Sequence, residues 1–451
     1  MRDNSLHTDA QRGSSEKQLR FCRRATKLYL LFLLTVYPLF TGISGYNYLH
    51  LKKFLLFALS TVVWTLCLLV SSVRCSLRGG RIAHSAFPGL CLAAFAAAAA
   101  ASTILARGVY LAGSRYDGLA THLLYVCVLW GVWRFGEADE ALLWAFAAAY
   151  TLCCGVALAQ LLGWNALWLF PGGMNYYSDY VQEVGRFLGT VGNIDVLSAL
   201  HCLALPLFAA AIVRARDKRR FLLLVPLVLG LTCQIWAHVA SGLLALGVTA
   251  ALALPAAYVY LRRAAGAPAD KRVLLLGPLA LIAAALLVYC LPPFPGAAGE
   301  LRSVLHGEIR DEFGSHRILI WRETVRVIRE HPLLGVGPEN LAYWLDVTFE
   351  RYSPLLGETL RTSADNAHNE YLQLAATFGL CGAVPATALG VCALRRTLRR
   401  REHGAAVFIL TPCLLCYLTQ AFFNIGLCIV TPLFCAAFSL LLAQTEPSAV
   451  E

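Results

Sequence analysis

Charged side chains are scarce in this chain. Of its 451 residues only 14% are Asp, Glu, Lys or Arg, whereas 58% are hydrophobic, and the mean hydropathy is +0.61. Soluble globular domains carry about 25% charged residues. The apolar residues instead come in blocks of about 20, the length that an α-helix needs to cross roughly 30 Å of hydrocarbon. These values exclude a soluble globular protein and predict a membrane protein.

Other classes lack their usual signatures as well. None of the sixteen cysteines lies in the long loop between residues 291 and 370, which excludes a secreted disulfide framework. Cys413 and Cys416 form a CxxC inside an apolar block, and we interpret them as small buried hydrophobes. The net charge of +11 is spread over short loops without a basic domain, which argues against nucleic-acid binding. The polar first 27 residues lead into an apolar block without the features of a cleaved signal peptide.

The apolar blocks predict an all-α polytopic membrane protein with about twelve transmembrane helices. The expected spans are 28–46, 54–73, 86–106, 119–135, 140–162, 187–213, 221–237, 239–261, 273–291, 371–394, 405–424 and 426–443. With the N-terminus inside, the cytoplasmic segments carry twenty-five Lys and Arg residues and the short outer loops carry five. Because positively charged loops stay in the cytoplasm, we expect both termini there.

This topology divides the chain into five parts. They are a cytoplasmic N-terminal tail (1–27), transmembrane helices 1–9 (28–291), a large extracytoplasmic loop (292–370), transmembrane helices 10–12 (371–443) and a cytoplasmic C-terminal tail (444–451). A second outer segment, residues 164–185, is rich in tyrosine, which fits an aromatic belt at the membrane interface.

The sequence of the large loop predicts that it folds. His316–Glu330 has apolar residues at the spacing of one helical face, with Ser315 as the expected N-cap and Pro332 after its end. Asn340–Arg351 is expected to form another helix, with an apolar side of its own. Loops of about 80 residues are usually functional or disordered, and these patterns favour function.

Three features of the outer face could carry chemistry. A glycine-rich turn at residues 331–338 contains Gly335 and Gly337, which allow close approach of the backbone to a ligand, although any helix–helix turn could look the same. Residues 364–371 place His368 where the tenth span enters the membrane, near the outer interface. The third feature is a group of arginines on that side: Arg186, Arg317, Arg322, Arg326 and Arg329.

Taken in order, these motifs resemble the O-antigen ligase/polymerase superfamily over roughly residues 180–385. The resemblance is carried by Gly185-Arg186, Gly189-Thr190, Gly192-Asn193, Arg317, Trp321, His331-Pro332-Leu333-Leu334-Gly335-Val336-Gly337, Ala367-His368-Asn369-Glu370-Tyr371-Leu372 and Gly379-Leu380-Cys381-Gly382. It implies a GT-C-like glycosyltransferase in the bacterial cytoplasmic (inner) membrane. The implied donor is a glycan on undecaprenyl diphosphate, with no metal, cofactor or nucleotide sugar.

By position, the resemblance makes His368 the catalytic base, with Arg186 and Arg317 holding the diphosphate. A histidine can accept a proton from a sugar hydroxyl, and guanidinium groups can neutralise a leaving diphosphate. The family's Ser-Arg-Gly is replaced here by Ala240-Ser241-Gly242, so Arg322 or Arg326 would have to substitute for the missing arginine. Arg322 and Asn369 complete the expected substrate-binding residues. Asn193-Ile194-Asp195 also stands where an Asn-Pro-Asn is common.

Several alternatives stay open at this point. The hydroxyl acceptor could be a growing glycan, a lipid or a protein side chain, which would make the enzyme a polymerase, a ligase or an oligosaccharyltransferase. A polytopic transporter or flippase of lipid-linked glycan would also have many spans, although such proteins usually show internal repeats. A non-catalytic member that only binds glycolipid is the third alternative, which the missing arginine leaves open.

Overall fold

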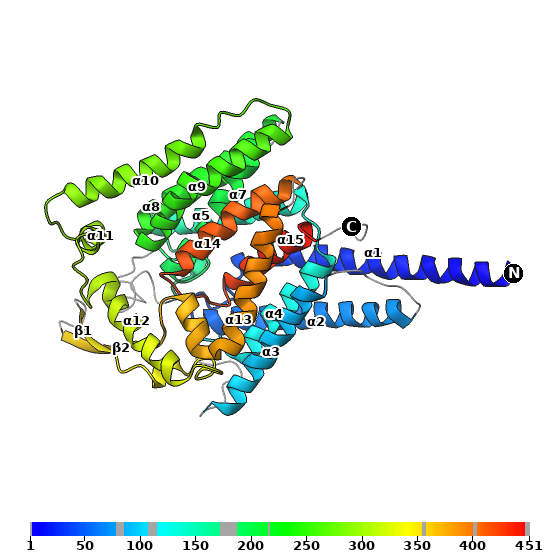
Figure 1. Cartoon of the computed structure of the whole chain (residues 1–451), viewed down its shortest axis with the longest axis horizontal. Coiled ribbons are helices and arrows are strands. Elements are labelled where there is room, and N and C mark those ends of the chain that lie inside the picture. The colour runs from blue at the N-terminus through cyan, green and yellow to red at the C-terminus, as the bar shows by residue number, and fades with distance from the viewer. Residues whose placement is uncertain are drawn as a thin grey trace.

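The computed structural model describes residues 2–77, 85–106, 115–171, 187–214, 217–353, 358–399 and 404–446. Within them the chain is almost entirely helical, with one two-stranded hairpin (Figure 1). The bundle helices are α1 (Arg2–Leu39), α2 (Leu49–Leu77), α3 (Ala86–Leu105), α4 (Leu119–Phe135), α5 (Glu140–Leu161), α7 (Ile194–Arg214), α8 (Leu224–Ala237), α9 (Ala240–Ala264), α10 (Val273–Cys290), α13 (Glu370–Arg399), α14 (Ala405–Ala421) and α15 (Thr431–Gln444).

Eight helices in the described ranges are long and apolar enough to cross a membrane. They are α2, α3, α5, α7, α9, α10, α13 and α8 together with the short 3-10 helix η2 (Lys218–Leu223) that precedes it. The apolar helices α4, α14 and α15 are shorter. A multi-pass membrane protein is therefore supported, whereas twelve crossings and a GT-C-like fold stay predictions.

The helices α1 and α2 run side by side and project beyond the rest of the bundle (Figure 1). The expected second span began after Lys53, but α2 starts at Leu49 and includes this lysine. Its side chain is fully buried, and the ammonium group donates to the carbonyls of Tyr37 (2.9 Å) and Pro38 (3.1 Å). Because these carbonyls lie in the last turn of α1, Lys53 satisfies acceptors that a helix end leaves open.

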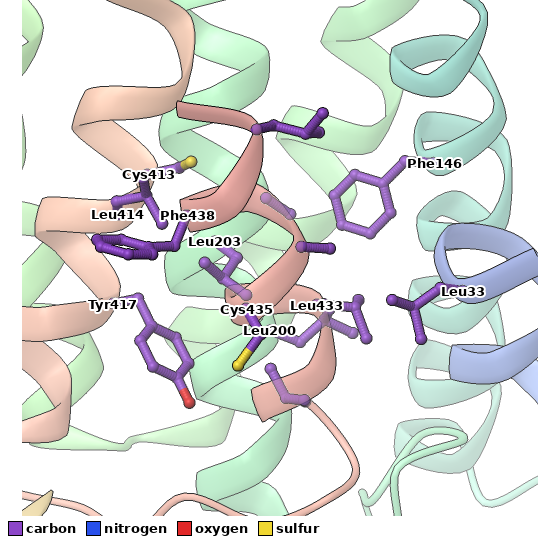
Figure 2. Close-up of a cluster of buried hydrophobic side chains, with 14 of the residues drawn as sticks. Leu33, Phe146, Leu200, Leu203, Cys413, Leu414, Tyr417, Leu433, Cys435 and Phe438 are labelled. Atoms are coloured by element: carbon purple, nitrogen blue, oxygen red, sulfur yellow. The ribbon is translucent and has the colours of Figure 1, made fainter. Parts of the chain in front are cut away.

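Helix α7 is the centre of the bundle and packs against α8, α9 and α14. Its apolar side chains meet those of α14 and α15 in the core (Figure 2). Figure 2 labels Leu33, Phe146, Leu200, Leu203, Cys413, Leu414, Tyr417, Leu433, Cys435 and Phe438. All sixteen cysteines are free thiols, and Cys413 and Cys416 are buried in apolar surroundings.

The large loop forms α11 (Ala297–Leu305), α12 (Phe313–Glu330), the 3-10 helix η3 (Leu341–Tyr343) and the strands β1 (Thr348–Ser353) and β2 (Glu358–Ser363). These elements lie at the end of the molecule opposite the N-terminus (Figure 1). Helix α12, η3 and the residues before β1 share a hydrophobic cluster that includes Ile320, Val327, Leu341, Leu345 and Val347, and that reaches Ala376 of α13. The loop is therefore packed onto the bundle through its own core.

The helix expected at 316–330 is present as α12, but its start differs from the prediction. The helix begins at Phe313, and Gly314, Ser315 and His316 all have positive φ angles, so Ser315 lies inside the first turn and is not an N-cap. The prediction of a helix at Asn340–Arg351 is wrong. Only a 3-10 turn forms there, and Thr348–Ser353 pairs antiparallel with Glu358–Ser363. The β-branched and aromatic residues of Thr348–Ser353 are types favoured in strands. The partner strand is a separate segment, so the pattern within one segment does not reveal the pairing.

The glycine-rich turn docks the loop onto α13 through four backbone hydrogen bonds. The N–H groups of Val336 and Gly337 donate to the carbonyls of Ala376 and Thr377, both at 2.9 Å. In return, residues 380 and 381 of α13 donate to the carbonyls of residues 332 and 333, at 2.8 and 3.0 Å. These bonds replace the i→i−4 bonds that 380 and 381 would otherwise make. Helix α13 therefore breaks at Gly379 (φ +60°, ψ −165°).

We expect Gly379→Ala to lower the free energy of unfolding by about 2 kcal/mol or more, because a Cβ in this backbone conformation is strained. It would also lie 2.3 Å from the backbone of Leu333. Thermal unfolding in detergent measures the effect. The control is Gly390→Ala on the same helix, where no atom lies within 4 Å of an added Cβ. Equal melting temperatures for the two variants would contradict the docking role.

Candidate functional site

His368 lies in the short segment between β2 and α13. Its backbone is left-handed (φ +46°), and its N–H donates to Oδ1 of Asn366 at 3.0 Å. The imidazole Nδ1 is buried and has no hydrogen-bond partner. Burial, followed by the charges of Arg317 and Arg115, lowers the pKa of His368 to about 4, and Asp365 opposes this shift. At neutral pH the imidazole is therefore uncharged and can accept a proton.

Arg317 lies beside His368 at the start of the regular part of α12. The turn at 314–316 folds back so that Nη1 donates to the carbonyl of Gly314 at 2.7 Å. Nε is buried without a hydrogen-bond partner. Burial lowers the pKa of the guanidinium, against the opposing effects of Asp195 and Glu300. The group is still charged at neutral pH, because arginine does not lose its proton in proteins. The fold brings Arg317 and His368 together although they are distant in the sequence.

Trp321 follows Arg317 by one helical turn and points the same way from α12. Its indole Nε1 is buried without a hydrogen-bond partner. Its ring lies 5.4 Å from that of Phe422 and 6.0 Å from that of Phe423, in the connection between α14 and α15. Buried polar atoms without partners are rare and usually mark a functional site or a missing ligand. Arg317 Nε and Trp321 Nε1 are two such donors on one helix, and His368 Nδ1 is a third buried polar atom without a partner.

Asp195 enters the site from the first turn of α7. Asn193 caps this helix, because its Oδ1 accepts from the N–H groups of Asp195 (2.8 Å) and Val196 (3.2 Å). Asn424 Nδ2 donates to the Asp195 carbonyl at 3.2 Å and ties the α14–α15 connection to the same place. The Asp195 carboxylate is close enough to Arg317 to affect its pKa. The sequence marked this residue only as a departure from a family motif.

Arg115 is the site residue that sequence reasoning missed. It precedes α4, and its guanidinium forms an ion pair with Asp365, three residues before His368. In the sequence Arg115 is one of several basic residues in short outer loops, and nothing local connects it to a residue 250 positions later. Two guanidinium groups, those of Arg317 and Arg115, therefore flank His368.

The other expected site residues have different surroundings. Arg186 lies outside the described residues. Arg322 is 63% exposed and pairs with Asp311 at 2.7 Å, so its guanidinium is engaged on the surface of the loop. Asn369 is buried, and its Oδ1 accepts from the N–H groups of Tyr371 and Leu372, both at 3.0 Å. This is the geometry of an N-cap for α13.

Because Asn369 caps α13, we expect Asn369→Ala to lower the free energy of unfolding by about 1 kcal/mol. Asn369→Asp and Asn369→Ser keep an oxygen that can accept the same hydrogen bonds and should retain most of the stability. Chemical or thermal denaturation of the three variants checks this order. If all three variants lose the same stability, the capping role is wrong.

Two other features of the structure lie apart from His368. An apolar cavity of about 260 Å³ has Arg214 among its lining residues, at the far end of α7 from Asp195. Among the described residues, no group of three or more His, Cys, Asp or Glu side chains is arranged to hold a metal ion. The side chains that act on or lie close in sequence to His368 and Arg317 supply an imidazole, two guanidinium groups, an indole N–H and carboxylates.

Part of the chain matches a known protein family. Residues 225–387 match the O-antigen ligase family, and the match supports membership of the O-antigen ligase/polymerase superfamily. The matched stretch runs from α8 into α13 and contains Arg317, Trp321 and His368, whereas Arg115 and Asp195 lie before it. No curated protein matches the chain.

Proposed function

We propose that this chain, a member of the O-antigen ligase/polymerase superfamily, is a metal-independent, inverting membrane glycosyltransferase. It transfers a glycan from an undecaprenyl-diphosphate-linked donor to a hydroxyl acceptor on the outer side of the bacterial cytoplasmic membrane. The observation that carries the proposal is the arrangement around His368. The charge of Arg317 acts on the buried imidazole of His368, whose Nδ1 has no hydrogen-bond partner, and α12 carries two buried donors without partners, Arg317 Nε and Trp321 Nε1.

The proposed reaction is a single displacement. The acceptor oxygen attacks the anomeric carbon while the bond from that carbon to the diphosphate oxygen breaks, so the configuration inverts. The hydroxyl proton passes to the imidazole of His368, and the lipid diphosphate leaves with the bonding electron pair. Developing negative charge on the leaving group is stabilised by Arg317, because charge-assisted hydrogen bonds in a water-poor site are strong.

The donor itself would improve the base. With a pKa of about 4 in the free protein, His368 is a weaker base than an ordinary histidine. A bound diphosphate brings negative charge next to Arg317 and thereby offsets one of the charges that lower the pKa of His368. The pKa should therefore rise when the donor binds, towards the range in which general-base catalysis is effective.

The orientation of the site relative to the membrane is part of the proposal. His368 precedes α13, at the end of the bundle that the sequence assigns to the outside, and the basic loops assigned to the cytoplasm follow the opposite ends of α7, α9 and α13. Labelling of single cysteines introduced between residues 297 and 346 in intact cells tests this. Labelling only after the cytoplasmic side has been exposed would overturn the orientation.

The activity is tested with the purified full-length protein in lipid vesicles that contain a synthetic undecaprenyl-diphosphate-linked glycan and candidate hydroxyl acceptors. The expected products are free undecaprenyl diphosphate and a glycoside of inverted anomeric configuration, formed at the same rate with and without a metal chelator. Retention of configuration would exclude the single displacement. Movement of the donor across the vesicle membrane without release of lipid diphosphate would favour a flippase instead.

The role of Arg322 is tested separately. A lower donor affinity in the Arg322→Ala variant would show that this arginine contributes to donor binding, and an unchanged affinity would show that it does not.

A further inference from the structure

The backbone of His368 is held in an unfavourable conformation by a chain of side-chain contacts. A left-handed φ angle costs a non-glycine residue about 1–2 kcal/mol, and it persists only where the surroundings enforce it. Here Arg115 pairs with Asp365, Oδ1 of Asp365 accepts from Nδ2 of Asn366 at 2.7 Å, and Oδ1 of Asn366 accepts from the N–H of His368 at 3.0 Å. The contacts run without interruption from Arg115 to the His368 backbone.

The other end of this chain is anchored to the docking turn. The backbone N–H groups of Arg115 and Asp117 both donate to the carboxylate of Glu339, at 3.1 and 2.8 Å. Glu339 follows Gly337, whose N–H donates to the carbonyl of Thr377 in α13. The segment that carries Arg115 is therefore fixed by the same turn that docks the loop onto α13. Arg115 connects this rigid point to the segment that bears His368.

We propose that Arg115 is a positioning residue for His368, which it holds in its left-handed conformation through Asp365 and Asn366, so that the imidazole faces the Arg317 side of the site. This inference rests on the proposed role of His368 as the base. A direct role of Arg115 in donor binding is the competing possibility. The geometry disfavours it, because a diphosphate bound to Arg115 would have to replace Asp365 as the partner of the guanidinium. That replacement would break the contacts that hold His368.

The charges around His368 give a readout of these contacts that needs no donor. The groups that act on its titration are Arg317 from α12, Arg115 from the segment before α4, and Asp365 from its own segment; Asp195 of α7 acts on Arg317 in turn. Loss of Arg115 removes a charge that lowers the pKa of His368, so the pKa should rise. Loss of the Asp365 charge, which raises the pKa of His368, should lower that pKa below its wild-type value. Both losses break the same chain of contacts.

The test compares Arg115→Gln with Asp365→Asn in the full-length protein. Two measurements are made on each: transfer kinetics with the lipid-diphosphate-linked donor, and the pH dependence of His368 modification by diethyl pyrocarbonate, followed by peptide mass spectrometry. Positioning predicts that both variants lose about tenfold in kcat with little change in donor KM. It also predicts that the midpoint of His368 modification moves up in Arg115→Gln and down in Asp365→Asn.

The control is Arg23→Gln, which breaks another arginine–carboxylate pair, Arg23 with Glu137 at 2.9 Å, on the N-terminal helix away from the site. It should change neither measurement. The proposal is overturned if Arg115→Gln raises donor KM at unchanged kcat while Asp365→Asn tightens donor binding, because that is the pattern of a direct ligand. It is also overturned if neither variant moves the His368 midpoint. Should Arg115→Gln fail to fold, Asp365→Asn carries the same two readouts.

The modification measurement needs no transferase activity. If the wild-type protein transfers no glycan but the two midpoints move in opposite directions, the positioning of His368 stands and the proposed function fails. If transfer occurs and the midpoints do not move, the function stands and the positioning role fails.

Discussion

Replacement of His368 by alanine should lower the rate of glycan transfer by about 10²- to 10⁴-fold, the usual contribution of a positioned general base. Donor affinity should change little, because the proposed contacts to the diphosphate come from Arg317. The folded protein should be no less stable, since the substitution removes a buried nitrogen that has no hydrogen-bond partner. Transfer rates in vesicles, together with melting temperatures, check both statements.

The pH dependence of the wild-type protein gives a second readout of the same residue. The active form is the neutral imidazole, so the rate should rise as pH increases through the pKa of His368 and stay level above it. For kcat/KM, which reports the free protein, the inflection is expected near the pKa of about 4. For kcat it should lie higher, because the bound donor adds negative charge. An inflection that persists in His368→Ala would assign it to another group.

Replacement of Arg317 by alanine should reduce kcat/KM by roughly 30- to 1,000-fold, which corresponds to about 2–4 kcal/mol for a charged donor in a water-poor site. Arg317→Lys should recover part of this loss, because lysine keeps the charge but lacks the Nε–H that the structure leaves open. Donor binding and transfer are measured separately with radiolabelled donor. Donor affinity equal to wild type in both variants would remove Arg317 from the diphosphate site.

Arg317→Ala should not destabilise the fold. Among the described residues no carboxylate pairs with Arg317 within 4.0 Å, and its Nε has no partner. A half-buried charge without an ion-pair partner costs desolvation energy, which alanine would not. A loss of activity with an unchanged or higher melting temperature is the signature of a residue kept for function rather than for stability.

The sequence predicted the features that depend on local pattern. Apolar blocks long enough to cross a membrane became helices, because only helices satisfy every backbone group inside hydrocarbon. The apolar spacing of His316–Glu330 correctly predicted α12. The family motifs brought Arg317 and His368 into one hypothesis, and in the structure the charge of Arg317 is close enough to His368 to lower its pKa.

The features that were missed depend on pairing between distant segments. No local pattern could show that Thr348–Ser353 would find a partner strand, or that α13 would exchange its own hydrogen bonds at Gly379 for bonds to the glycine-rich turn. The contact of Arg115 with Asp365 likewise joins the segment before α4 to the segment before α13. In the sequence an arginine at an outer helix end looks like an ordinary interfacial anchor.

The central claim is that His368 performs chemistry on a donor that Arg317 holds. The most direct measurement follows donor binding and glycan transfer together, in vesicles with radiolabelled lipid-diphosphate-linked glycan, for the wild type, His368→Ala and Arg317→Ala. The account predicts that His368→Ala binds donor like the wild type but transfers less than about one hundredth as fast, and that Arg317→Ala binds donor weakly. Transfer by His368→Ala at the wild-type rate would contradict it.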